Sequence, residues 1–194
     1  MLKKILPMIF LLGCAACSKD PVEVEVADPD PITWSECGYE MGDHPCDFTL
    51  KDQHGEDWNL YDNYGSLIVL DFSAEWCYYC QVAALDAQTV QDAYAEEGLI
   101  YVTIMIEDSS GNPANEGLLT RWSDHFGITS PVLEGSRDLL DTGDGEGWLI
   151  SGWPTFYFID KEMVLSKVMR GYSDETMLTI IDLMLIEEAD EAEQ

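Results

Sequence analysis

Two cysteines at a predicted boundary between a strand and a helix constrain this chain more than any other feature. Residues 66–70 form a continuous apolar run of strand length, and Cys77 and Cys80 follow it. Beyond them, apolar positions recur at the spacing of one helix face: Val82, Leu85, Thr89, Val90 and Ala93. Gly98 then provides a stop signal. Cys77 is therefore predicted at a helix N-terminus, where free N–H groups and the helix dipole favour thiolate over thiol.

Three ordered motifs in this sequence resemble the thioredoxin superfamily. Residues 72–80, with Trp76 directly before Cys77, resemble its active site, and residues 153–155 resemble its cis-proline loop. Residues 42–55 further resemble the opening of the membrane-anchored, extracytoplasmic thiol-disulfide oxidoreductases related to peroxiredoxins. Three motifs in the right order are specific, whereas a lone pair of cysteines would be weak evidence.

The resemblance and the apolar pattern together predict an α/β, thioredoxin-like fold, with a central mixed β-sheet and helices on both faces. A hairpin is expected around the turn at residues 52–55. Further predicted strands cover residues 99–106, 155–159 and 164–170, and Ser173 is expected to cap a final helix.

An inserted helix and strand are the feature that the resemblance assigns to the peroxiredoxin-related branch. Asn112 is placed as an N-cap and Pro113 as the first residue of a helix that runs to about Phe126, before Gly127. The short apolar segment at residues 131–133 supplies the inserted strand.

Thiol-disulfide exchange needs an attacking thiolate, a second thiol that resolves the mixed disulfide, and a partner disulfide. Cys77 is the expected nucleophile, at the exposed end of the helix, and Cys80 the more buried resolving thiol, so these two form the redox disulfide. Asp71 matches the position at which thioredoxins carry a buried acid. Burial raises the pKa of a carboxyl group, so Asp71 could exchange a proton with Cys80 through a water. This chemistry needs no cofactor, and no metal site is expected.

The resemblance also assigns roles in substrate binding. Pro154, if its peptide bond is cis, brings the backbone of Trp153 beside Cys77, where it can pair with an extended substrate peptide. Trp76 and Trp153 are expected to flank the disulfide.

The residues between the two cysteines depart from the thioredoxin pattern. Tyr78 and Tyr79 stand where thioredoxins carry Gly-Pro, and neither brings a positive charge near Cys77. The direction of electron flow therefore stays open, although reduction of exported proteins is the commoner role in the resembled branch.

Two other functions remain as alternatives. A copper chaperone on the same fold uses two cysteines separated by three residues and a distant histidine, whereas this chain has two residues between Cys77 and Cys80. A thiol peroxidase needs a peroxidatic cysteine preceded by a Pro and Thr/Ser pattern, which is absent here.

The N-terminus has the pattern of an export signal at residues 1–17. Lys3 and Lys4 supply a positive start, and residues 5–12 supply an apolar run that is too short to span a bilayer. The protein is therefore expected in the bacterial cell envelope, on the periplasmic side, where disulfides persist.

The end of this signal resembles the lipobox of bacterial lipoproteins. The leucine three positions before Cys14 favours lipidation there, whereas a more usual signal length and an even number of remaining cysteines favour Cys17. Residues 18–36, which are rich in Pro, Asp and Glu, are predicted to form an extended tether to the membrane. A thioredoxin-like domain at residues 37–190 and an acidic tail at residues 191–194 complete the chain.

A second pair of cysteines precedes the domain motifs. In an exported protein, Cys37 and Cys46 are expected to form a structural disulfide that closes a short loop. A metal site formed with His44 and His54 is an alternative, although the set lacks closely spaced ligand pairs. A second redox-active pair is also conceivable.

The charge of the chain restricts its partners. A formal net charge of -29, with 9 Lys and Arg residues in 194, leaves no basic cluster that could bind nucleic acid or an anionic membrane surface. The expected partners are thiols and disulfides of exported proteins, and a membrane-bound or periplasmic electron donor.

Overall fold

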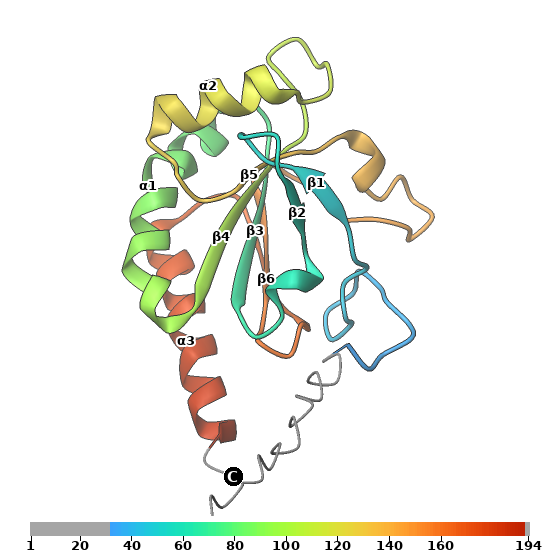
Figure 1. Ribbon diagram of the computed structural model, residues 1–194, viewed down its shortest axis with the longest axis vertical. Helices are drawn as coiled ribbons and strands as arrows, with labels where there is room; N and C mark the ends of the chain where they lie inside the picture. Colours follow the sequence, from blue (N-terminus) through green and yellow to red (C-terminus); the bar gives the residue numbers. More distant parts are fainter. Residues whose placement is uncertain (1–31, 193–194) are drawn as a thin grey trace, which may run out of the picture. The chain divides into compact units, whose positions relative to one another are not determined.

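A computed structural model describes residues 32–192 of the chain (Figure 1). The predicted signal peptide, both candidate lipidation cysteines, most of the predicted tether and the last two residues lie outside this range. Within it, no helix is both long enough and apolar enough to cross a membrane.

The core of the fold is a mixed sheet of five strands in the order β5-β4-β3-β6-β7. The central strand β3 runs parallel to β4, and β4 parallel to β5, whereas β6 is antiparallel to both β3 and β7. The strands are β3 Leu67–Ser73, β4 Leu99–Met105, β5 Val132–Glu134, β6 Thr155–Ile159 and β7 Leu165–Arg170. The central strand is longer than predicted and reaches Ser73, so Asp71 lies inside the sheet.

The described residues also form three α-helices and three one-turn 3-10 helices. They are η1 Tyr61–Asn63, α1 Tyr78–Tyr94, η2 Ala95–Glu97, α2 Glu116–Phe126, η3 Arg137–Leu139 and α3 Asp174–Ala192. The predicted hairpin is also present, as an antiparallel pair of strands β1 Thr49–Lys51 and β2 Asp57–Asn59. The helix α3 continues through part of the segment that was predicted to be an acidic tail.

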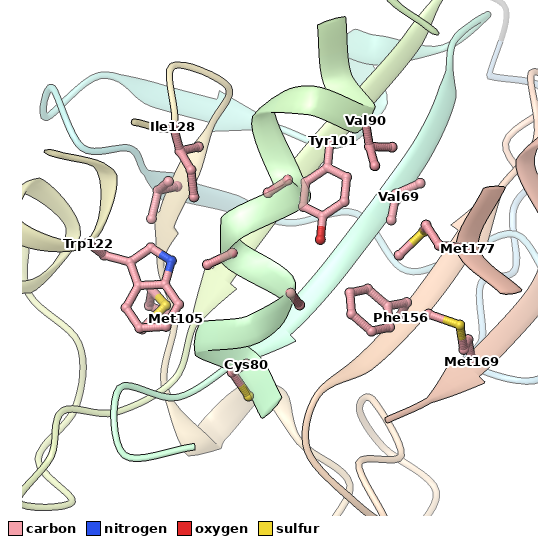
Figure 2. Close-up of a cluster of buried hydrophobic side chains, with 14 of the residues drawn as sticks. Val69, Cys80, Val90, Tyr101, Met105, Trp122, Ile128, Phe156, Met169 and Met177 are labelled. Carbon is pink, nitrogen blue, oxygen red and sulfur yellow. The ribbon is translucent and has the colours of Figure 1, made fainter. Parts of the chain in front are cut away.

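The buried face of α1 differs from the one predicted. Leu85 is 66% exposed, and Thr89 and Ala93 are also exposed. The buried face consists of Cys80, Ala83, Ala84, Ala87 and Val90. Small side chains let the helix lie close to the sheet, and Figure 2 shows Tyr101 and Val69 beside the part of α1 between Cys80 and Val90. The apolar spacing predicted a buried face that includes Leu85, but the alanines are the side chains small enough to fit between the helix and the sheet.

The start of α2 also differs from the prediction. Asn112 bonds to Asp108, with its backbone N–H 2.9 Å from the carboxylate, and Pro113 pairs with Glu107 in an isolated bridge. The N-cap is Asn115, whose side chain accepts a hydrogen bond from the N–H of Leu118 at 3.1 Å. The predicted end of the helix is confirmed, because Gly127 takes a left-handed conformation there.

The two faces of the sheet are covered by different kinds of structure. Residues from α1, α2 and α3 contribute to one cluster of buried side chains, and Figure 1 shows α1 and α3 along the same face. The other face is covered by the hairpin, by η1 and η3, and by the loops around Tyr39 and Trp148. The α/β, thioredoxin-like class is thus confirmed, with the three α-helices on one face of the sheet and the short 3-10 helices η1 and η3 on the other. The described segment before β3 forms the hairpin and η1 instead of an α-helix.

One edge of the sheet is closed by a side chain from the hairpin turn. The amide of Gln53, which is 7% exposed, donates to the carbonyl of Ser130 at 3.0 Å and accepts from the N–H of Val132 at 2.8 Å. These contacts satisfy backbone groups of β5 in the way that a neighbouring strand would.

Cys37 and Cys46 form a disulfide, with their Cα atoms 4.8 Å apart. The loop they close lies along the start of β7. The N–H of Gly42 donates to the carbonyl of Leu165 at 2.8 Å, and the N–H of Leu165 donates to the carbonyl of Asp43 at 2.9 Å. The disulfide therefore holds a segment that extends the sheet.

Replacing Cys37 and Cys46 together by serine should lower the free energy of unfolding by about 2–3 kcal/mol, because the disulfide restricts the unfolded chain. Urea denaturation measures this change. The matched control replaces Cys77 and Cys80 by serine. These cysteines are 3 positions apart, whereas Cys37 and Cys46 are 9 apart. The control should destabilise the fold less, because closing a shorter loop restricts the unfolded chain less. An unchanged free energy of unfolding in the first variant would contradict the structural role.

Candidate active site

The Cys77–Cys80 pair lies where β3 gives way to α1. Cys77 is the N-cap of the helix, in an extended conformation, and its Sγ accepts a hydrogen bond from the N–H of Cys80 at 3.1 Å. The two residues form a disulfide with their Cα atoms 5.2 Å apart. The first turn of α1 contains no acidic residue, so no carboxylate of that turn opposes a negative charge on Sγ. This geometry favours a thiolate at position 77 when the disulfide is reduced.

The two cysteines differ less in exposure than expected. Cys77 is 5% exposed and Cys80 is fully buried, so Cys77 is the more accessible but is not widely open to solvent. The side chains around it are much more exposed, with Tyr78 at 69% and Tyr79 at 60%. The exposed surface next to Cys77 is therefore largely aromatic.

Asp71 is buried in the sheet on the face that α1 covers. Its carboxylate accepts hydrogen bonds from the hydroxyl of Ser73 at 2.7 Å and from the hydroxyl of Tyr101 at 3.1 Å. Figure 2 shows the Tyr101 ring beneath α1, with its hydroxyl directed toward the end of the helix that carries Cys80. Sequence analysis placed Asp71 here by resemblance but did not find its two hydroxyl partners.

Burial raises the pKa of Asp71 from 3.8 to about 7, because a carboxylate in the core loses its hydration. The hydrogen bonds from Ser73 and Tyr101 act in the opposite direction and only partly offset burial. The pKa of Tyr101 is raised well above its ordinary value, by burial and then by the nearby carboxylate. Asp71 can thus bind and release a proton near neutral pH, as a proton acceptor for a buried thiol needs.

The predicted proline loop lies next to the cysteine loop. The Trp153–Pro154 peptide bond is cis. The rings of Trp76 and Trp153 meet edge to face, with their centroids 5.9 Å apart. Because Trp153 also packs against the cluster that contains Cys77, the two loops that the sequence motifs identified form one site.

The indole of Trp76 is fixed by residues that the sequence gave no reason to select. Its N–H donates to the carboxylate of Glu107 at 2.7 Å, and Arg137 binds the same carboxylate through two hydrogen bonds of 2.7 Å each. Glu107 follows β4 and Arg137 begins η3, so they are distant in sequence from the cysteines. An acid and an arginine in loops carry no local pattern that predicts such a contact.

A groove of about 680 Å³ runs beside the cysteine loop, between it and α2. Glu75 and Gln81 line one side, and Arg121 and Trp122 belong to the other. Arg121 reaches across to Glu75, whose carboxylate it approaches to 3.3 Å. Burial would raise the pKa of Glu75, but hydrogen bonds from Ser109 and Arg121 outweigh it and lower that pKa.

The other cysteine pair and the histidines considered with it lie elsewhere. The two cysteine pairs lie toward opposite ends of the central strand. The Cys37–Cys46 loop contacts Leu165, which is linked through Ile159 to Ile68 at the start of β3. Cys77 follows the end of the same strand. The alternative metal site is not formed, because both of its cysteines are in a disulfide. His44 hydrogen-bonds the carbonyl of Met163, and His54 is exposed in the hairpin turn.

Comparison with known families matches residues 41–168 of the chain to the AhpC/TSA family. This match covers both motifs of the site and most of the sheet. The chain belongs to the AhpC/TSA family.

Individual relatives of this AhpC/TSA protein are thiol-disulfide oxidoreductases. The chain is 24% identical to thiol-disulfide oxidoreductase ResA of Geobacillus thermodenitrificans, over 68% of this chain and 70% of that protein. A thiol:disulfide interchange protein of the thioredoxin family from Chlorobium tepidum has 22% identity and a TM-score of 0.60, covering 78% of this chain and 99% of that one. The exposed lipoprotein thioredoxin Etrx1 of Streptococcus pneumoniae has 27% identity and a TM-score of 0.54, covering 73% and 99%. The resemblance to the thioredoxin superfamily is thus confirmed, and the AhpC/TSA protein is an oxidoreductase.

Asp71→Asn should change the pH dependence of stability of this AhpC/TSA protein. Because the pKa of Asp71 is raised in the folded state, its contribution to stability is present below pH 3.8 and is lost as the pH rises to about 7. The difference between these values corresponds to about 4 kcal/mol at pH 8, as an upper estimate. Asparagine carries no charge, so the variant should exceed the wild-type protein in free energy of unfolding at pH 8 but not at pH 4.

Urea denaturation at both pH values measures this difference. Asp124→Asn, which removes an exposed carboxylate on α2, is the matched control and should leave the pH dependence unchanged. An Asp71→Asn variant that tracks the wild-type protein at all pH values would show that Asp71 is ionised normally.

Proposed function

We propose that this protein is an extracytoplasmic thiol-disulfide oxidoreductase that exchanges disulfides with exported proteins, with reduction of the partner favoured over its oxidation. The observation that carries the proposal is the disulfide between Cys77 and Cys80 at the N-cap of α1, beside a cis Trp153–Pro154 bond. A helix N-terminus lowers the pKa of a thiol and so supplies the attacking thiolate that exchange needs.

The reaction follows from the positions of the two sulfurs. In the reduced protein, the Cys77 thiolate attacks one sulfur of a partner disulfide, which forms a mixed disulfide and releases a partner thiolate. Cys80 then attacks Sγ of Cys77, so the second partner thiol leaves and the Cys77–Cys80 disulfide forms. The partner gains two electrons and the cysteine pair loses two. In oxidation the same steps run in reverse.

Asp71 supports the second step in this proposal. Cys80 is fully buried and must lose a proton before it can attack. Asp71 has a raised pKa of about 7, so it can accept that proton inside the core at neutral pH and later release it. Its hydrogen bonds to Ser73 and Tyr101 hold the carboxylate in one orientation.

Binding of the partner chain is assigned to the aromatic rim and the groove. The backbone of Trp153 is placed to pair with an extended segment beside Cys77, with Trp76 at the flank. The groove lined by Glu75 and Gln81 has room for residues that adjoin the partner cysteine. An acidic protein of net charge -29 favours neutral or basic partner segments.

The location is proposed from the N-terminal pattern and the relatives. Cleavage before Cys14, or alternatively Cys17, would leave a lipid-bearing cysteine joined by an acidic tether to the domain. One relative is named an exposed lipoprotein thioredoxin, which agrees with this arrangement. Attachment on the periplasmic side of the envelope would bring the site near exported proteins and a membrane-bound or periplasmic electron donor.

Disulfide exchange is favoured over the two alternatives by the site itself. A thiol peroxidase needs a peroxidatic cysteine preceded by a Pro and Thr/Ser pattern, and the residues before Cys77 lack that pattern. A copper chaperone needs further ligands near the cysteines, and the part of the chain that the structure describes contains no cluster of three potential ligands.

A Cys80→Ser variant tests the proposed function. Without the resolving thiol, mixed disulfides between Cys77 and partner proteins should persist in the native envelope and should be isolated by affinity capture under non-reducing conditions. Peptide mass spectrometry identifies the linked cysteine.

The matched control is Cys77→Ser/Cys80→Ser, which retains the disulfide between Cys37 and Cys46 and should capture no partner. An empty trap in the Cys80→Ser variant, or adducts through Cys37 or Cys46, would refute the assignment of Cys77 as the nucleophile.

A further inference from the structure

The carboxylate of Glu107 holds the active-site tryptophan in place. Its Oε1 accepts hydrogen bonds from Nε1 of Trp76 and from Nη2 of Arg137, both at 2.7 Å, while its Oε2 accepts from Nε of Arg137 at 2.7 Å. The backbone carbonyl of Glu107 also accepts from the N–H of Glu75 at 3.0 Å. One residue therefore fixes both the backbone before Trp76 and its side chain.

This carboxylate depends on Arg137 for its charge. The Glu107 side chain is 5% exposed, and a buried carboxylate is costly unless it is paired and hydrogen-bonded. Arg137 binds it through two nitrogen atoms of the guanidinium, Nε and Nη2, and such two-point pairing gives the strongest ion pairs. The Arg137 side chain itself is 65% exposed, so it binds from the surface and its removal leaves no cavity in the core.

Trp76 connects this ion pair to the reactive site. It directly precedes Cys77, is 45% exposed, and lies against Trp153 of the cis-proline loop. Its indole N–H bonds to Glu107 and its ring packs against the ring of Trp153, so these two residues together determine its orientation.

We propose that Arg137 is a positioning residue that acts through Glu107 to hold the Trp76 indole in place and thereby controls access of partner sulfurs to Cys77. This inference rests on the proposed function, in which Cys77 is the nucleophile. Cys77 is 5% exposed, whereas Trp76 beside it is 45% exposed, so the orientation of the indole shapes the surface next to a sulfur that has little exposure of its own. Release of the indole would open the approach to Sγ and would also remove an ordered surface against which a polypeptide partner binds.

A second arginine provides a close comparison. Arg121 also reaches the cysteine loop from the surface, binds Glu75 at 3.3 Å, and has a side chain that is 62% exposed. No hydrogen bond joins it or Glu75 to the Trp76 side chain among the described residues. The two arginines therefore support the same loop, but only Arg137 acts on the indole.

The test compares Arg137→Met with Arg121→Met in the full-length protein after reduction. The rate at which iodoacetamide alkylates Cys77 is measured by peptide mass spectrometry, together with the KM and kcat for reduction of insulin as a polypeptide disulfide. We expect Arg137→Met to raise the alkylation rate about threefold to tenfold, the effect of losing a charge-assisted hydrogen bond. The KM for insulin should rise by a similar factor. Arg121→Met should leave the alkylation rate near that of the wild-type protein, and only this rate is compared for it, because Arg121 lines the groove assigned to the partner chain.

A double-mutant cycle separates positioning from a general loss of stability. Trp76→Phe keeps a ring but removes the N–H donor, so it should reproduce the faster alkylation, and adding Arg137→Met to it should have little further effect. Arg137→Lys, which can form one hydrogen bond where arginine forms two, should restore part of the wild-type rate.

Three outcomes would overturn the proposal: an unchanged alkylation rate in Arg137→Met, an equal change in Arg121→Met, or additive effects of Arg137→Met and Trp76→Phe. Should Arg137→Met fail to fold, Glu107→Gln supplies the same comparison with the carboxylate charge removed. If the wild-type protein does not reduce insulin, the proposed function fails on that substrate, whereas the alkylation rates still decide the role of Arg137.

Discussion

The hydrogen bond from the N–H of Cys80 to Sγ of Cys77 marks the point on which the site depends. It makes the first cysteine the N-cap of α1 and puts the second inside the first turn. This arrangement requires a strand that ends directly before the helix, and β3 provides it from the centre of the sheet. In sheets with parallel strands, binding sites form beyond the carboxyl ends of those strands, and the cysteine loop occupies this position.

The central strand that leads to this site also contains a buried acid, which lowers the stability of the fold at neutral and higher pH. Among the described residues, the hydrogen bonds to the buried Asp71 carboxylate come from two hydroxyl groups and no cation pairs with it, so ionised Asp71 is unfavourable for folding. A nonpolar side chain would pack better at this position, and a buried acid with a strongly raised pKa is characteristic of functional sites. The cost is local, since the surrounding strand is apolar and fully buried.

Features with a local sequence signal were predictable, and features made by distant contacts were not. The apolar run of β3, the cysteine spacing and the Trp153–Pro154 motif each identify their element without reference to the rest of the chain. The face of α1 could not be read in the same way, because Leu85 and the alanines both fit helical periodicity and only the depth of the gap above the sheet decides between them.

The same limit explains the remaining differences. Asn112 and Asn115 are equally good caps by residue type, and the bond between Asn112 and Asp108 makes the choice. The contact between Glu107 and Arg137 depends on how the fold brings the end of β4 close to the start of η3, so neither segment has a local sequence pattern that predicts it. The candidate site is therefore known from sequence at its reactive centre and from structure at its supporting residues.

The amide of Gln53 has a consequence beyond the sheet it completes. By occupying the carbonyl of Ser130 and the N–H of Val132, it removes hydrogen-bonding groups that another polypeptide could use to add a strand at that edge. Unpaired backbone groups on an edge strand are where a second molecule can add a strand, so this side chain protects part of the β5 edge against self-association.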